Sequence, residues 1–364
     1  MSKINIIKAI NYPIYIWEAS FTRLNKYISS FEFKYSKFLI LLDENVKQFC
    51  LPVLIKNVDK LKFSEIIEIK SGEENKTIET CKLLWKKLID LKADRKSLFI
   101  NLGGGVISDM GGFVASTYMR GIKYINIPTT LLSQVDASIG GKVGVNQNKL
   151  KNQIGLFSNP EAVFINTVFL KTLPEKNLLS GYAEIIKHAL IADADYWKLI
   201  KKQPVDKIIE WEDIILRSVE IKNEIVKNDP KEENLRKILN FGHTFGHAFE
   251  TFSLKFNYKP LSHGEAIAMG MICESFLSYK IAGLPKSQLD EIVKYILSNF
   301  EYYKINKNNI EELFNFMIHD KKRENNNLNF ILLSSIGKAV INKNCSNDVI
   351  KQCIDYYCSV SELL

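Results

Sequence analysis

The sequence predicts an α/β amino-terminal domain, with a Rossmann-like and mostly parallel sheet, over residues 1–173, followed by an all-α domain over residues 174–364. At 364 residues the chain is longer than the chains that usually form a single hydrophobic core, so two domains are expected. Its first half alternates short apolar runs with helical stretches, and its second half has almost only helical periods.

Five short apolar runs predict the strands of the sheet. Each ends near Gly, Asp or Pro and is separated from the next by a helical stretch, which is typical of parallel sheets with both faces covered. The runs are Phe38–Leu42, Ile66–Ile69, Ser97–Leu102, Tyr124–Ile127 and Ala162–Ile165. Ligands of such sheets bind at the carboxyl ends of the strands, where Asp43, Gly72 and Gly103 to Gly105 fall.

From about Pro174 onward, apolar residues recur at helical spacing. The predicted helices are Leu178–Ile191, Trp211–Val226, Ile238–Phe252, Gly264–Ala282 and Leu289–Phe300. One strand-like run, Phe330–Leu333, interrupts them, and Asn325–Asn327 predicts a turn.

The net charge of +8 comes almost entirely from lysine, since only six arginines are present. The lysines are spread evenly, whereas nucleic-acid-binding proteins usually concentrate basic residues on one face. The charge therefore indicates solubility and a mild attraction for anionic substrates, and no nucleic-acid partner.

Six scattered cysteines without a CxxC motif argue against a disulfide framework or a thiolate zinc site. The amino terminus lacks a continuous apolar run, and no apolar stretch approaches the ~20 residues that span a membrane. These features predict a cytoplasmic protein with no membrane partner.

The segment Gly103–Gly112 follows a predicted strand and opens a predicted helix. That order places backbone N–H groups where a pyrophosphate could lie. The match to GxGxxG is incomplete, because Ser108 stands at one glycine position and the acidic residue expected ~20 positions later is absent. Taken alone, the segment is either a dinucleotide loop in an unusual order or an ordinary tight turn.

Three of the five histidines lie close together, at positions 243, 247 and 263. His243 and His247 are four apart on one predicted helix, so both rings leave the same face. Spacing alone favours both as zinc ligands, with core histidines as the alternative. Glu184 is the best carboxylate candidate, because a bare carboxylate on an apolar helix is costly; its alternative is an ion pair with Lys187.

Phosphate-binding candidates gather in another glycine-rich segment. Asp136 and Lys142 flank a Gly-Gly turn, and Lys151 follows. Arg120 and Arg236 gain weight because arginine is rare here, and a guanidinium clamps phosphate or carboxylate well.

Together these residues resemble the 3-dehydroquinate synthase family from about Asp43 to Lys322, in the family's order. The matching segments are Gly103–Asp109, Arg120–Gly121, Pro128–Leu131, Gln134–Lys142, Glu184–Lys187, Arg236–His247, His263–Glu265 and Asp320–Lys322.

The resemblance implies a lyase of the shikimate pathway, which leads to chorismate and the aromatic amino acids. The substrate would be 3-deoxy-D-arabino-heptulosonate 7-phosphate, and the products 3-dehydroquinate and phosphate. NAD would oxidise a ring alcohol and later reduce the ketone again, with phosphate elimination between these steps and an aldol closure after them. The first domain would bind NAD, and the second the metal, Zn²⁺ or Co²⁺, and the substrate.

The resemblance also assigns residues. The metal ligands would be Glu184, His243 and His263, whereas His247 would face the substrate near the phosphate and the transferring proton. Matches to the family's substrate contacts are Lys142, Asn152, Lys187, Lys222, Arg236, Asn240 and Lys321. Matches to its NAD contacts are Asp43, Glu73, Lys76, Gly104, Gly105, Asp109, Thr129, Thr130 and Thr172, together with Asp136, Lys142 and Lys151. Asp136 would bridge the two regions, and Arg120 would reach a neighbouring site across a homodimer interface.

Two alternatives share this machinery: another sugar-phosphate cyclase of the 2-deoxy-scyllo-inosose synthase type, and a metal-dependent polyol dehydrogenase. The joint presence of Lys142, Arg236, Asn240 and His247 favours dehydroquinate synthase over the first. The second would produce NADH from a polyol, whereas a cyclase releases phosphate without net NADH.

Overall fold

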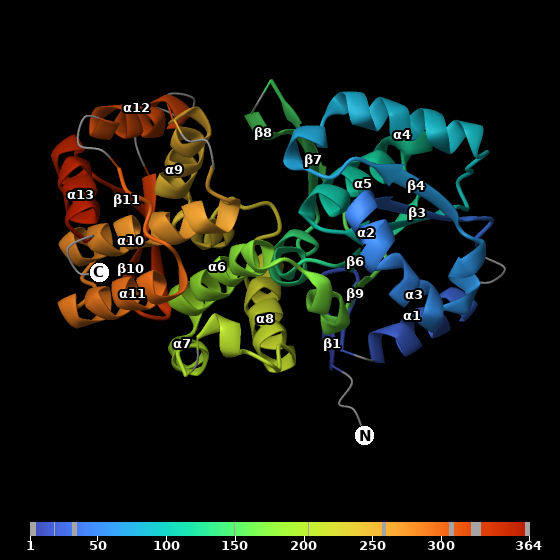
Figure 1. Ribbon diagram of the computed structural model, residues 1–364, viewed down its shortest axis with the longest axis horizontal. Helices are drawn as coiled ribbons and strands as arrows, with labels where there is room; N and C mark the ends of the chain where they lie inside the picture. The colour runs from blue at the N-terminus through green and yellow to red at the C-terminus, as the bar shows by residue number, and fades with distance from the viewer. Residues whose placement is uncertain are drawn as a thin grey trace. The chain divides into compact units, whose positions relative to one another are not determined.

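The computed structural model describes residues 5–17, 19–30, 35–148, 150–202, 204–256, 260–305, 309–321 and 329–360. They form two compact units, shown in Figure 1. The first contains Met1–Pro174 and Trp211–Asn223, and the second Glu175–Glu210 and Glu224–Leu364. The last boundary, between Asn223 and Glu224, falls inside helix α8 (Glu212–Asn228).

A seven-stranded sheet forms the centre of the first unit. Its strand order is β1-β2-β9-β6-β5-β3-β4, and only the β1–β2 pair is antiparallel. The strands are β1 (Asn5–Lys8), β2 (Pro13–Ile16), β3 (Phe38–Asp43), β4 (Glu65–Ile69), β5 (Leu98–Gly103), β6 (Lys123–Pro128) and β9 (Val163–Ile165). The prediction of a mostly parallel sheet is confirmed, and β1 and β2 extend it.

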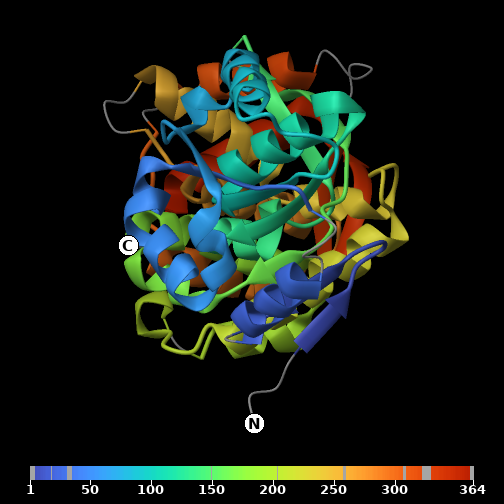
Figure 2. The same ribbon diagram turned by 90° about the vertical axis from the view of Figure 1, so that its right-hand side faces the viewer.

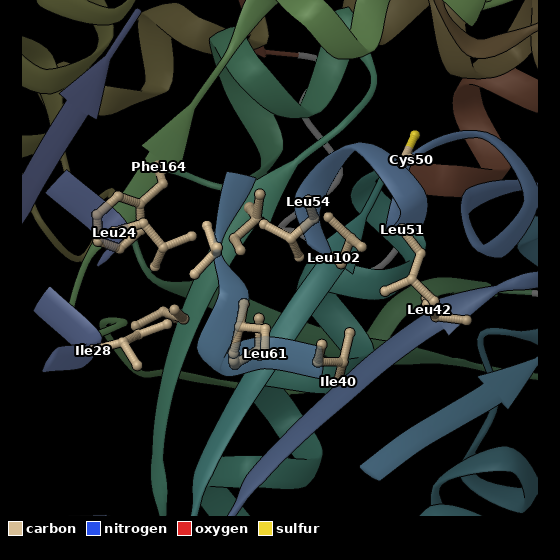
Figure 3. Packing of buried hydrophobic residues seen from close by; sticks show 14 of the residues in the cluster. Leu24, Ile28, Ile40, Leu42, Cys50, Leu51, Leu54, Leu61, Leu102 and Phe164 are labelled. Carbon is tan, nitrogen blue, oxygen red and sulfur yellow. The ribbon is translucent and has the colours of Figure 1, made fainter. Parts of the chain in front are cut away.

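Both faces of this sheet are buried under helices. Alternate residues of each strand point to opposite sides, so each strand contributes side chains to both faces. On β3, Ile40 and Leu42 belong to a buried cluster with Leu24 and Ile28 of α1 (Ala19–Ser30) and with Leu51 and Leu54 of α3 (Leu51–Asn57), all labelled in Figure 3. Val46 of α2 (Glu44–Phe49) is part of the same cluster. Leu39 and Leu41 point the other way, into a second cluster with residues of α4 (Ile78–Asp90) and α5 (Gly105–Thr117). Figure 2 shows the ribbons of the sheet and its covering helices from a second direction. Continuous apolar runs in the sequence reflect this two-sided burial.

The strand order reverses between β3 and β5. From β3 the chain moves outward to β4, then returns to the other side of β3 with β5 and continues through β6 to β9. Such a reversal leaves a crevice at the carboxyl ends of the two strands, the usual ligand position in open α/β sheets. Asp43 ends β3 and Gly103 ends β5, so both border this position.

A hairpin outside the sheet, β7 (Lys142–Gln147) and β8 (Leu150–Phe157), belongs to the same unit. Its backbones approach closely, since a Cβ on Gly144 would lie 2.7 Å from the Ile154 carbonyl oxygen. The hairpin carries three of the residues singled out from the sequence, Lys142, Lys151 and Asn152.

Among its described residues, the second unit is mostly helical and contains one hairpin, so the predicted helical half is confirmed. Its helices are α6 (Glu175–Ala192), α7 (Ala194–Ile200), α9 (His243–Phe256), α10 (His263–Ile281), α11 (Lys286–Asn299), α12 (Ile310–Lys321) and α13 (Asn347–Ser359). The strand-like run Phe330–Leu333 lies in β10 (Asn329–Ser335), which pairs with β11 (Lys338–Asn344). The turn predicted at Asn325–Asn327 lies outside the described residues.

Helix α10 is the central element of this unit. It packs against α6, α9, α11, α13 and β10, and it is buried from Gly264 to Ser278 apart from Glu265. Within the described residues, no helix combines the length and the apolar character needed to cross a bilayer.

The single helix predicted at Ile238–Phe252 is wrong, because the structure breaks it. A 3₁₀ turn, η7 (Leu235–Asn240), comes first, and α9 begins only at His243. Between them Gly242 adopts φ = 82°, a left-handed conformation that glycine tolerates best. The apolar spacing continues across this break, so periodicity could not reveal it.

Candidate active site

Three potential metal ligands lie together in the second unit. One ligand atom each of Glu184, His243 and His263 lies within 4.8 Å of the others. His243 Nε2 is 4.0 Å from Glu184 Oε1. One carboxylate and two imidazoles, each from a different helix, match the donor set of a catalytic zinc site with an open position.

Glu184 lies in the middle of α6, where its side chain is only 1% exposed. Neither of its carboxylate oxygens accepts a hydrogen bond from a described residue, although Lys187, one turn later, forms an ion pair with Oε2. A buried carboxylate in this position is costly unless another ligand completes it. A carboxylate that is buried and accepts no hydrogen bond from the described residues fits a bound cation, and its ion pair with Lys187 is buried rather than at the surface.

His243 is the first residue of α9, and each of its two ring nitrogens lies near an oxygen atom. Nδ1 lies 3.3 Å from the Phe241 carbonyl oxygen, which leaves Nε2 toward Glu184. Metal-binding histidines commonly donate their second ring N–H in this way. Burial first, and then the charges of Lys187, His247 and His263, hold the pKa of His243 well below its usual value, so the neutral ligand form prevails at neutral pH.

His263 opens α10, and the helix start places it. Ser262 and Glu265 form a capping box, in which each side chain accepts from the other residue's backbone N–H. The next residue, Gly264, lies so close to α6 that a Cβ there would be 2.3 Å from Ser180 Cα. Ser180 precedes Glu184 by one turn, so this contact brings His263 to the carboxylate.

His247 shares a helix with His243 but is not part of the ligand group. Its ring centroid is 5.4 Å from that of His243 and 6.3 Å from that of His263, and the residue is exposed. The ligand atoms that lie within 4.8 Å of one another include one from His263 and none from His247, so the geometry favours His263 over the pair suggested by the four-residue spacing.

Two predicted substrate contacts, Arg236 and Asn240, lie on the 3₁₀ turn η7 that precedes α9. One of them is buried and the other exposed. Arg236 is 2% exposed, and its Nη1 donates to the Pro230 carbonyl oxygen at 2.7 Å. Asn240 is exposed and donates to Glu232 Oε1 at 3.0 Å. Lys321 is the last residue of α12, and its side chain, like the neighbouring Lys322, lies outside the described residues.

In the first unit, the glycine-rich segment forms the start of α5. Gly104 is the N-cap and Gly105 the first helical residue, so the unpaired N–H groups of this helix end border the reversal of strand order. Space there is tight, since a Cβ on Gly104 would lie 3.0 Å from Thr130 Cγ2. Thr129, 3% exposed, donates its backbone N–H to the Gly103 carbonyl oxygen at 3.0 Å.

Three predicted residues surround the buried ammonium of a fourth, Lys76. Nζ lies 2.6 Å from both Asp109 Oδ2 and Asn152 Oδ1, and 3.9 Å from Glu73 Oε1. Burial lowers the pKa of Lys76, but the charges of Asp109 and Glu73 outweigh that effect and raise it, so the ammonium stays charged. Asn152 is 76 positions from Lys76, and only the β7–β8 hairpin brings them together.

Two other predicted residues, Lys222 and Asp136, form an ion pair. Lys222, on α8, donates to Asp136 Oδ1 at 2.6 Å and to its carbonyl oxygen at 2.5 Å. Asp136 lies in a π-helical turn, η4 (Ser133–Ala137), a rare conformation that is frequent at functional sites.

The remaining predicted residues of this unit lie at the end of a strand, in 3₁₀ turns and in the β7–β8 hairpin. Asp43 caps α2 by accepting from Val46 N–H at 2.9 Å. Arg120, in the left-handed region at φ = 69°, is exposed. Lys142, Lys151 and Thr172 are exposed as well.

Sequence reasoning missed several side chains that hold these residues in place. Glu250 Oε2 lies 3.7 Å from His263 Nδ1, and Asn146 bonds both Glu73 Oε1 and the Asn152 N–H. Glu274, 0% exposed, accepts N–H groups at the start of α9. The sequence did contain a signal for Glu274, because it is a lone carboxylate within the apolar Met269–Phe276 run, where an unsatisfied charge would be costly.

Comparisons with known proteins cover most of both units. A family model described as 3-dehydroquinate synthase N-terminal matches residues 66–180, and one described as 3-dehydroquinate synthase C-terminal matches residues 181–323. A curated 3-dehydroquinate synthase of Parabacteroides distasonis is 40% identical over 338 residues, 92% of this chain and 95% of the relative. One from Campylobacter jejuni is 42% identical over 323 residues, 86% of this chain and 90% of the relative.

Solved structures show the same fold. A 2-deoxy-scyllo-inosose synthase complexed with carbaglucose-6-phosphate, NAD⁺ and Co²⁺ has a TM-score of 0.86 at 25% identity, covering 97% of this chain and 99% of that one. A probable glycerol dehydrogenase from Sinorhizobium meliloti has a TM-score of 0.62 at 14% identity, covering 98% and 99%. The second likeness concerns the fold alone.

Proposed function

The chain belongs to the 3-dehydroquinate synthase family, and we propose that Glu184, His243 and His263 form the metal site of that family's reaction. The protein is a lyase of the shikimate pathway that converts 3-deoxy-D-arabino-heptulosonate 7-phosphate to 3-dehydroquinate and phosphate. The observation that carries the metal assignment is the buried carboxylate of Glu184, which accepts no hydrogen bond from the described residues and lies beside two imidazoles.

NAD⁺ and a divalent metal, Zn²⁺ or Co²⁺, are the cofactors, as the related cyclase with NAD⁺ and Co²⁺ supports. When bound, they supply a reversible hydride acceptor and a Lewis acid for substrate hydroxyls, respectively. The net reaction needs no external oxidant, because the hydride returns to the same substrate.

The first unit supplies the NAD site in this proposal. The amino end of α5 at Gly104 and Gly105 offers N–H groups to the pyrophosphate, and charged Lys76 lies in a network with Asp109. The other proposed contacts are Asp43, Glu73, Thr129, Thr130, Asp136, Lys142, Lys151 and Thr172.

The second unit supplies most of the substrate contacts. Arg236 is buried and anchored to the Pro230 carbonyl, so its guanidinium is preorganised for an anionic group. The exposed His247 ring is placed to hold or pass a proton beside the metal ligands. The other proposed contacts are Lys142, Asn152, Lys187, Lys222, Asn240 and Lys321.

Phosphate release from the heptulosonate phosphate with substoichiometric NAD⁺ tests this function. We expect many turnovers per NAD⁺ without net NADH, and loss of turnover after chelation that Zn²⁺ or Co²⁺ restores. Turnover insensitive to chelators would contradict the metal site. NADH accumulation with a polyol, and no phosphate release, would indicate a dehydrogenase instead.

We further propose a cytoplasmic homodimer in which Arg120 completes the site of the neighbouring subunit. Its exposure leaves the residue accessible to a neighbouring subunit. Mixing inactive Arg120→Ala with inactive His247→Ala should restore activity, because one site of the mixed dimer then has both residues. No restoration after subunit exchange would place Arg120 in its own subunit's site.

A further inference from the structure

The amino end of α9 is capped by a carboxylate from a different helix. Glu274, on α10, accepts the Gly242 N–H on Oε2 at 2.7 Å. Its Oε1 accepts the N–H groups of Thr244 at 3.0 Å and Phe245 at 3.4 Å. These three donors lie on both sides of His243, the first residue of α9.

Local sequence cannot supply this cap. The first N–H groups of any helix lack intrahelical acceptors, and a Ser, Thr, Asp or Asn just before the helix usually satisfies one of them. Here that position is Gly242, which has no side chain and is held at φ = 82°. Leaving these buried donors unsatisfied would be costly, so the helix start depends on Glu274.

The charge of Glu274 also suits a cation nearby. A helix amino end carries a partial positive charge, which disfavours a metal ion bound by the first residue of that helix. A carboxylate that accepts three of the N–H groups offsets this charge and is itself satisfied despite its 0% exposure.

We propose that Glu274 is a positioning residue that sets metal affinity through His243. It holds the backbone on both sides of His243, and the ring is then aimed by a single bond from Nδ1 to the Phe241 carbonyl at 3.3 Å. This inference rests on the proposed metal site. Glu274 touches neither substrate nor metal in this role.

Glu274→Gln tests the proposal with the smallest change of shape. The amide keeps one acceptor oxygen but turns an NH₂ group toward at least one of the three backbone donors, whichever way it is flipped. Ser278→Ala is the matched control. It lies one turn further along α10 and is 0% exposed, and its Oγ accepts from Leu333 N–H at 2.8 Å and donates to the Glu274 carbonyl oxygen at 2.6 Å. Ser278→Ala therefore removes a buried contact of the Glu274 backbone while leaving the carboxylate and its three donors in place.

The readouts are the affinity of the metal-free proteins for Zn²⁺ and Co²⁺, measured by chelator competition, and the visible absorption spectrum of the Co²⁺ forms. We expect Glu274→Gln to weaken both metals about 10- to 100-fold and to alter the Co²⁺ bands, as for other residues that orient metal ligands. Ser278→Ala should keep the affinity and spectrum of the wild type even if its melting temperature falls.

The rise in melting temperature on adding Zn²⁺ provides a second measurement of metal binding. Each variant is compared with its own metal-free form, so a general loss of stability does not affect the result. Wild-type affinity and spectrum in Glu274→Gln would overturn the proposal, as would equal losses in Ser278→Ala. A failure of the metal site itself would look different: the wild type would then bind no metal, or Glu184→Gln would bind it as well as the wild type does.

Discussion

Gly270 lies so close to Gly242 that a Cβ at position 270 would stand 2.0 Å from the Gly242 carbonyl oxygen. The same Cβ would lie 2.6 Å from the Gly246 N–H nitrogen. Helices α9 and α10 therefore meet backbone to backbone at the start of α9, where His243 sits. Only glycine allows this approach, because the obstructing atoms belong to the backbone and cannot rotate away.

Gly270→Ala should separate the two helices and move His243. Overpacking of this kind costs about 1–3 kcal/mol, so we expect a lower denaturant midpoint together with weaker Zn²⁺ binding. Denaturant unfolding and metal titration measure the two effects. Ser275→Ala, on the same helix, removes an atom instead of adding one and serves as the control; equal metal affinity in both variants would argue against this coupling.

His243→Ala and His247→Ala should separate metal binding from catalysis. The first removes a proposed ligand within the 4.8 Å group and should lose bound metal. The second should keep near-full metal content and lose most activity. Elemental analysis beside phosphate-release assays checks both, and stoichiometric loss of metal in His247→Ala would restore it as a ligand.

Lys76→Met should weaken NAD⁺ binding and destabilise the first unit. It leaves Asp109, 17% exposed, without its partner at 2.6 Å, and breaking a buried pair typically costs about 3–5 kcal/mol. Calorimetric titration measures the affinity for NAD⁺, and thermal unfolding measures the loss of stability. Lys86→Met, an exposed substitution on α4, is the matched control; unchanged NAD⁺ affinity in Lys76→Met would remove Lys76 from the cofactor site.

The acid stability of the second unit should depend on Glu291. Burial raises the pKa of this carboxyl, but hydrogen bonds from Lys201 and Trp197 and the charge of Lys201 outweigh it and lower the pKa below 4.5. A lowered pKa stabilises the fold above that usual value, and the contribution is lost as the pH falls through the folded-state pKa. Glu291→Gln should therefore melt earlier than the wild type at neutral pH.

Melting curves at successive pH values check this sign. The gap between the wild type and Glu291→Gln should narrow as the pH falls below 4.5. Trp197→Phe, which removes the donor at 2.6 Å, should show a smaller gap of the same form. A gap that does not change with pH would mean that the ionised carboxylate adds nothing.

Much of the fold could be predicted because its signals are local. Short apolar runs indicated β3, β4, β5, β6 and β9, since strands buried on both faces are apolar throughout. The strands β1 and β2 escaped notice because their pattern is brief and mixed. The helix break at Gly242 escaped because apolar spacing continues across it.

The sequence by itself determined the α/β-then-helical order, the glycine-rich helix start and, through the resemblance, a residue set for every role. The tertiary structure decided which groups meet: Glu184 with His243 and His263 rather than His247, Lys76 with Asn152, and Glu274 with the start of α9. These partners are far apart in the chain. Local spacing carries no information about them, because they are brought together only by the packing of helices and strands whose close approach glycines such as Gly264 and Gly270 permit.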